Sequence, residues 1–196
     1  SHRTSTEFIY QPSENSSKFI WKYLSFSNLL KGADSIDIED VEQVKLIEKA
    51  TSEEAYDEKE LLNLYKELSP YPEVEKCLKE LKSKKIKMAI LSNGTPLLLK
   101  NLFESNNIEK YFDSIISVEK VKIYKPDPKV YEIPVKKYSC KPENICFLSS
   151  NTWDVSGGGV FGYKSIWVNR SNKIFDKLGY RPKYTIKNLT QLLELL

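Results

Sequence analysis

The chain has 196 residues, 40% hydrophobic and 12% aromatic, enough for one domain of ordinary size or for a core with a small cap. Its 30 Lys and Arg residues are scattered and nearly balanced by 27 Asp and Glu, which argues against a nucleic-acid partner. No apolar run approaches the ~20 residues of a membrane span, so we expect no membrane partner.

The cysteines favour a reducing compartment. There are three, an odd number, and none stands in a Cys-x-x-Cys pair, which argues against a disulfide framework and against a zinc site. Cys77 and Cys146 fall in apolar patterns, and we expect both in the core. We therefore predict a cytoplasmic protein without a cofactor or a bound metal.

The pattern of residues 1–70 predicts a small helical cap region. Apolar residues recur at helical spacing over 37–50 and 52–68, and we expect a third helix over 19–30. Large apolar residues alternate near the N-terminus, where residues 6–10 could form a short strand. The proline-rich segment 69–72 is the predicted hinge to the rest of the chain.

Residues 71–196 predict an α/β domain. An amphipathic helix carries Val74, Cys77, Leu78 and Leu81, and strands and helices then alternate to the end of the chain. We expect strands over 87–91, 114–118, 145–148 and 165–169, and helices over 96–106 and 129–138, from about 157, and after the capping residue Asn188. This alternation predicts a parallel sheet with helices on both faces.

Polar residues follow three of these strands. Ser92 and Asn93 end the first, Lys125 lies in a proline-bounded turn after the second, and Ser149 begins a polar run after the third. The carboxyl ends of strands in an open α/β sheet face one ligand-binding crevice. Each cluster alone is typical of a surface turn, but together and in this order they predict a site.

These motifs carry a family resemblance. The segments 91–94 (Leu-Ser-Asn-Gly), 124–127 (Tyr-Lys-Pro-Asp) with Tyr131, and 149–154 (Ser-Ser-Asn-Thr-Trp-Asp) resemble the successive motifs of the haloacid dehalogenase superfamily. The last motif, together with 167–170 (Trp-Val-Asn-Arg), is similar to the L-2-haloacid dehalogenases. The resemblance implies a Rossmann-like core with a helical cap, and hydrolytic removal of halide from small 2-haloalkanoic acids.

The resemblance also implies roles for individual residues. In the family, an Asp carboxylate displaces the halide and water then hydrolyses the ester. Ser92 and Lys125 would hold the nucleophile and the substrate carboxylate, and Asn93 would lie near the leaving halide. Water would be placed and activated by three residues, with Asp154 as the base. Those three are Ser149, Asn151 and Asp154, while Tyr131 would line the pocket and Trp153 would wall its halide side.

A phosphatase of the same superfamily is the less favoured interpretation. Those enzymes bind Mg²⁺ through several carboxylates, because a hard cation prefers oxygen ligands and charge compensation. Here Ser149 and Ser150 stand where a Gly-Asp pair is usual, and Asp154 is the remaining carboxylate. This donor set suits a metal-free reaction better.

The family's nucleophile motif, of the type Asp-x-x-Gly-Thr, does not occur in the 196 residues. Asp34, Asp37 and Asp40 lack the Gly-Thr that would surround such a carboxylate. The family's first strand is central, so we expect segment 6–10 to fill its place, a neighbouring subunit in a homodimer to supply it, or a longer product to contain it. The first hypothesis is therefore an inactive dehalogenase-like chain, and the alternative is a pseudoenzyme that binds a small 2-substituted carboxylic acid or a protein partner.

Overall fold

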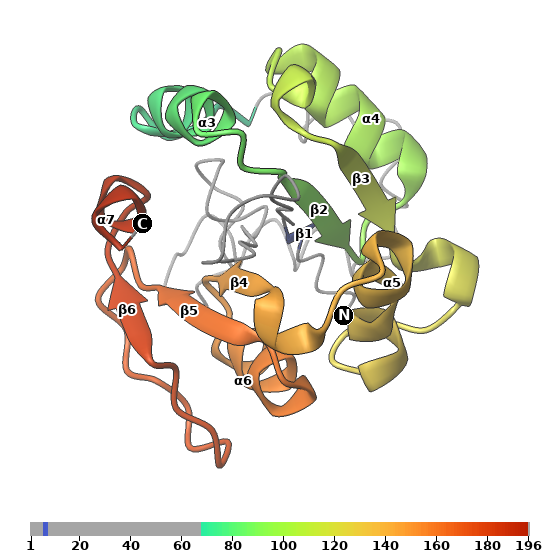
Figure 1. The fold of residues 1–196 in the computed structure, drawn as a ribbon, viewed down its shortest axis with the longest axis vertical. Helices are drawn as coiled ribbons and strands as arrows, with labels where there is room; N and C mark the ends of the chain where they lie inside the picture. The colour runs from blue at the N-terminus through green and yellow to red at the C-terminus, as the bar shows by residue number, and fades with distance from the viewer. Residues whose placement is uncertain (1–5, 8–67, 196) are drawn as a thin grey trace, which may run out of the picture.

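The computed structural model describes residues 6–7 and 68–195 (Figure 1). The predicted cap helices, the hinge's role as a domain boundary, and residues 8–10 of the predicted N-terminal strand lie outside what it describes. Its main helices are α3 (Val74–Ser83), α4 (Pro96–Ser105), α5 (Pro128–Tyr138), α6 (Thr152–Phe161) and α7 (Thr190–Glu194). Its strands are β1 (Thr6–Glu7), β2 (Ala89–Ser92), β3 (Ser114–Ser117), β4 (Cys146–Ser149), β5 (Lys164–Val168) and β6 (Tyr184–Ile186).

Short 3₁₀ turns complete the connections between these elements. They lie at Glu109–Tyr111, Val118–Val121 and Pro142–Asn144. The predicted mixed α/β class with parallel strands and several helices is confirmed. None of the helices in the described part of the chain is long and apolar enough to cross a membrane.

The described strands form two three-stranded sheets. In the first, β2 and β3 are parallel, with Ala89 opposite Ser114, and β1 lies antiparallel to β2 with Thr6 opposite Ser92. In the second, β4, β5 and β6 are all parallel. Because β1 also contacts β4, this two-residue strand lies between the two sheets.

Four of the main helices form two contacting pairs around these sheets, and α4 packs on β3. α6 lies on β4 and β5 and contacts α5, whereas α3 contacts α7. Figure 1 shows these two pairs at opposite sides of the molecule. The larger hydrophobic core cluster contains the fully buried side chains of Leu78, Phe103, Tyr131 and Phe147. Cys77 and Cys146 are buried there as predicted, and the three cysteines are not joined in disulfides.

The largest error in the predicted elements concerns α6. The sequence pattern predicts a start near Gly157, but the helix begins at Thr152 with Asn151 at its N-cap position, so the glycines lie inside it. Glycine is a poor helix former, and the neighbouring sequence gives no sign that these glycines belong inside a helix. The structure supplies that reason, because aromatic rings of Tyr131 and Tyr180 pack directly against two of these glycines.

Smaller differences concern boundaries and the C-terminal end. β2 begins at Ala89 rather than Lys87, because Met88 N donates to the Asp113 carboxylate and the ladder with β3 starts one residue later. The strand β6 is absent from the predicted elements. Leu189 occupies the N-cap position of the last helix, and Asn188, one residue earlier, accepts from Thr190 N through its Oδ1 at 3.0 Å. The regular helix is only five residues long. α5 continues through Pro134 as one helix.

Candidate active site

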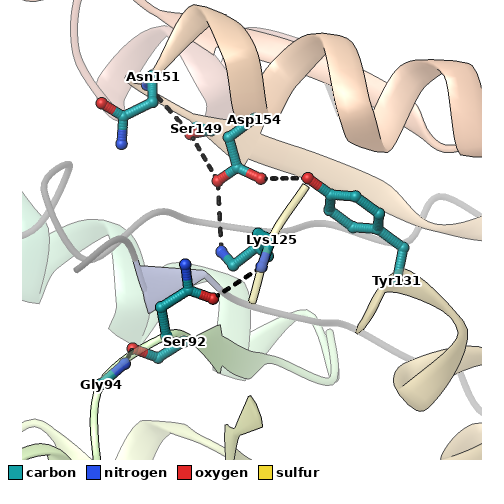
Figure 2. A network of polar contacts seen from close by, with 8 residues as sticks. Ser92, Gly94, Lys125, Tyr131, Ser149, Asn151 and Asp154 are labelled. Carbon is teal, nitrogen blue, oxygen red and sulfur yellow. Dashed lines mark hydrogen bonds and ion pairs between the residues drawn. The ribbon is translucent and has the colours of Figure 1, made fainter. Parts of the chain in front are cut away.

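Asp154 is the centre of the candidate site. It lies in the first turn of α6 and is fully buried. Its Oδ1 accepts a hydrogen bond of 2.6 Å from the Tyr131 hydroxyl, and its Oδ2 lies 3.3 Å from both Lys125 Nζ and Ser149 Oγ (Figure 2). A carboxylate is tolerated in a protein interior when it is paired and hydrogen-bonded, and three donors from three separate segments meet that requirement here.

Lys125 is fixed by both its backbone and its side chain. Its backbone N donates to Asn93 Oδ1 at 3.1 Å, which ties the turn before α5 to the end of β2. The side chain is completely buried, and its ammonium lies 3.3 Å from Asp154 and 6.0 Å from the centre of the Phe147 ring. The result is a rigid, desolvated cation beside a single carboxylate.

Ser92 and Asn93 form the turn that follows β2. Ser92 is buried, and its Oγ accepts from Gly94 N at 2.8 Å. Ser117 at the end of β3 donates to Gly94 O at 2.7 Å, so the turn is braced by the neighbouring strand. Ser92 and Asn93 therefore lie at the predicted strand edge, where Asn93 orients the Lys125 backbone.

Asn151 and Trp153 line a cavity whose described lining includes neither Lys125 nor Asp154. Asn151 N donates to Ser149 Oγ at 3.1 Å, whereas its side chain and that of Trp153 line a cavity of about 170 Å³. The Trp153 indole N–H is buried and has no hydrogen-bond partner among the described residues. In Figure 2 the Asn151 amide points away from Tyr131.

The far wall of this cavity comes from the loop after β5, which sequence reasoning did not assign to the site. Arg170 and Lys173 are the basic residues of that wall. Arg170 Nη2 pairs with Glu73 Oε1 at 2.6 Å, and its guanidinium lies 3.8 Å above the Tyr71 ring. The loop has no hydrophobic periodicity, so its sequence signals were the 167–170 motif and the position of Arg170 just after a strand.

The donor set does not suit a divalent cation. The described residues contain no group of three or more His, Cys, Asp or Glu side chains that could hold a metal ion. Asp154 is the carboxylate of the cluster, and a cation binding there would have to displace the Lys125 ammonium. The geometry instead fits the binding of an anion near Lys125 and removal of a proton by Asp154.

Comparison with known proteins identifies the family. Residues 5–162 match the haloacid dehalogenase-like hydrolases. The chain is 38% identical over 136 residues to (S)-2-haloacid dehalogenase 1 of Pseudomonas sp. (strain CBS-3), covering 69% of this chain and 60% of that protein. It is 37% identical over 132 residues to haloacetate dehalogenase H-2 of Moraxella sp. (strain B), covering 67% of this chain and 59% of that protein.

Solved structures agree with these relatives. A dehalogenase crystallised as an intermediate complex is 33% identical, with a TM-score of 0.69 over 79% of this chain and 70% of that one. L-2-haloacid dehalogenase from Xanthobacter autotrophicus with covalently bound chloropropionic acid is 26% identical, with a TM-score of 0.67 over 79% of this chain and 71% of that one. The chain spans about 60% of the length of the curated relatives that it matches. With its α/β fold and the motifs around Lys125 and Asp154, the chain belongs to the haloacid dehalogenase-like hydrolase family.

Proposed function

We propose that the cluster around Asp154 is the water-activating and carboxylate-binding part of a 2-haloacid dehalogenase site. We further propose that the 196-residue chain binds small 2-substituted carboxylic acids without releasing halide. The observation that carries the proposal is the buried Asp154 carboxylate shared by Lys125, Tyr131 and Ser149.

The chemistry of the reaction explains the division of roles. In the first step a carboxylate oxygen forms a bond to the carbon that bears the halogen, and the halide leaves with the bonding electrons. In the second step water adds to the ester carbonyl and gives up a proton, which releases a 2-hydroxy acid and restores the carboxylate. Asp154 is the group that would accept this proton, and Lys125 is the cation that would attract the substrate carboxylate.

Trp153 supports the halide side of this proposal. Its buried indole N–H lacks a partner among the described residues, and an unpaired buried donor suits an anion. Asn151 lines the same cavity and offers an amide. An anionic group of a small acid would match this combination of an amide and an indole N–H.

The first step needs a nucleophile, which is why we propose binding without turnover. The sequence contains no Asp-x-x-Gly-Thr segment. None of the residues in the described Asp154 cluster replaces it, because Asp154 is the carboxylate of that cluster and is assigned the role of the base. A chain with this site would retain affinity for the acid while the carbon–halogen bond stays intact.

Calorimetric titration with L-2-chloropropionate tests the binding. We expect saturable binding that is lost in the Lys125→Met, Asp154→Asn variant, in which both charges of the buried pair are removed together. Lys129→Met is the matched control, because Lys129 is an exposed lysine at the start of α5. Equal affinity in the double variant would overturn the assignment of this site.

A phosphatase assay tests the other activity considered for this superfamily. We expect no hydrolysis of p-nitrophenyl phosphate with or without Mg²⁺. Hydrolysis that depends on Mg²⁺ and disappears in Asp154→Asn would show that the site works as a phosphatase instead.

A further inference from the structure

Gly157 lies one helical turn after Asp154 in α6, next to the Tyr131 hydroxyl that hydrogen-bonds to Asp154. A Cβ atom on Gly157 would lie 2.6 Å from the Tyr131 hydroxyl oxygen and 3.0 Å from Pro126 Cβ. The first of these distances is too short for any carbon–oxygen contact, so a side chain here would force one of the two neighbours to move. Residues three apart share a helix face, which is why Gly157 meets Tyr131, one of the partners of Asp154.

Tyr131 has little room to move, whereas Pro126 is exposed and is held through its neighbour Lys125. Tyr131 is fully buried, and its ring packs against Phe147, Phe161 and Tyr163 with centroid distances between 5.7 and 5.9 Å. The Tyr163 hydroxyl also donates to the Tyr131 carbonyl oxygen. Pro126 directly follows Lys125, whose backbone is tied to Asn93. A methyl group at position 157 would therefore press on the tyrosine and on the lysine turn together.

We propose that Gly157 is a positioning residue that sets how closely the Tyr131 hydroxyl and the Lys125 turn approach Asp154. Gly157 itself touches no reacting atom, and it acts through Tyr131 and Lys125. Its functional meaning rests on the proposed function, in which Asp154 accepts the proton of water. The close approach of Gly157 to Tyr131 and to the Lys125 turn does not depend on a ligand, and it is tested separately.

A double-mutant cycle on unfolding tests the geometry. Gly157→Ala should lower the urea midpoint of the wild-type protein, because its methyl group meets the tyrosine hydroxyl. In a Tyr131→Phe background the same change should lower the midpoint much less, since the atom at 2.6 Å is gone and the remaining contacts are at 3.0 Å or more. Equal shifts in both backgrounds would overturn the proposal.

Gly159→Ala is the matched control within the same helix. It gives the same increase in helix propensity, and its Cβ would meet the ring of Tyr180, which belongs to the loop before β6 and has no described contact with Asp154. Its effect on the midpoint should be the same in the wild-type and Tyr131→Phe backgrounds. If Gly157→Ala prevents folding, recovery of folding in the Tyr131→Phe, Gly157→Ala variant supports the proposal, and failure of both variants contradicts it.

Titration with L-2-chloropropionate adds the functional readout. Gly157→Ala should weaken binding by about tenfold, as expected for disturbance of one hydrogen bond to a charged group, and Gly159→Ala should leave it unchanged. Unchanged affinity in Gly157→Ala would contradict the positioning role. Absence of binding by the wild-type chain would overturn the proposed function, while the unfolding cycle would still decide the role of Gly157.

Discussion

Lys125 and Asp154 form a completely buried ion pair, and such pairs have a characteristic energetic asymmetry. The desolvation of two charges roughly cancels their attraction, but removal of one partner leaves the other charge buried and uncompensated. At this site Tyr131 and Ser149 would still donate to Asp154 after loss of the lysine. These two neutral donors replace only part of the lost interaction.

The ion pair gives the first prediction. Lys125→Met should lower the free energy of unfolding by about 3–5 kcal/mol, and the added change Asp154→Asn should restore much of that loss. Urea unfolding of the two variants beside the wild type measures both values. If the double variant is as unstable as the single one, the pair is not held in the desolvated state described above.

Cys77 gives a prediction on pH. Burial raises the pKa of its thiol to about 11, with the nearby Glu73 carboxylate acting in the same direction. The folded protein therefore keeps a proton that the unfolded chain releases near pH 9, so the stability from this thiol is complete below pH 9 and is lost as the pH rises toward 11. Between about pH 8 and pH 10.5 the wild type should lose about 1–2 kcal/mol more than Cys77→Ala. The same loss in both proteins would contradict the raised pKa.

At the scale of elements, the packing of α6 depends on its glycines, which have no side chains and so allow close contact with neighbouring rings. Gly158 lies against the fully buried Phe147, and a Cβ on it would be 2.7 Å from that ring. Alanine is favoured over glycine by about 1 kcal/mol in a helix interior, so propensity alone predicts stabilisation. The packing predicts the opposite.

Gly158→Ala should therefore destabilise the protein by about 1–3 kcal/mol, the usual cost of overpacking a core. Thermal and urea unfolding both report this value. A stabilised variant would show that Phe147 adjusts without cost and that the helix is limited by propensity.

α6 also shows which parts of the molecule the sequence predicts. The strand edge was predictable, because apolar strands ending in Ser92 and Ser149 place their polar residues at one edge of a sheet. Ser149 and Lys125 do contact Asp154, and Asn93, which follows Ser92, binds the Lys125 backbone. The start of α6 was not predictable, because three consecutive glycines carry no periodic signal and their packing against Tyr131, Phe147 and Tyr180 is tertiary.

Other features could not be predicted from the sequence, for similar physical reasons. β6 has three residues, and its exposed Tyr184 and Thr185 give no alternation of buried and exposed positions. Arg170 was visible as part of a motif, but its neighbours Tyr71 and Glu73 lie about a hundred positions earlier in the chain. Such contacts depend on the folded arrangement and leave no local pattern.

At the scale of the whole molecule, Arg170 joins distant segments. Its guanidinium pairs with Glu73 at the start of α3 and lies on Tyr71, while Glu73 Oε1 also accepts from Leu189 N just before α7. Both partners of the pair are largely buried, with 11% and 19% of their side chains exposed, so solvent screens the interaction only in part. The loop after β5, the start of α3 and the start of α7 are thus connected through one carboxylate.

A double-mutant cycle between Glu73→Gln and Arg170→Met should give a coupling free energy of about 1–3 kcal/mol, above the value of an exposed pair. The exposed pair of Lys79 and Glu75 in α3 provides the comparison, and its coupling should stay below about 0.5 kcal/mol. Equal coupling in the two cycles would mean that the Arg170 pair is no more than a surface contact.

Chloride measurement on the wild-type chain tests the central claim most directly. The protein is incubated with saturating L-2-chloropropionate, and chloride is followed with an ion-selective electrode against a sample without protein. We predict no chloride above that background even though the acid is bound, because the 196 residues contain no nucleophile motif for the first step. Chloride release that disappears in the Lys125→Met, Asp154→Asn variant and persists in Lys129→Met would contradict this claim and show that the chain is a working dehalogenase.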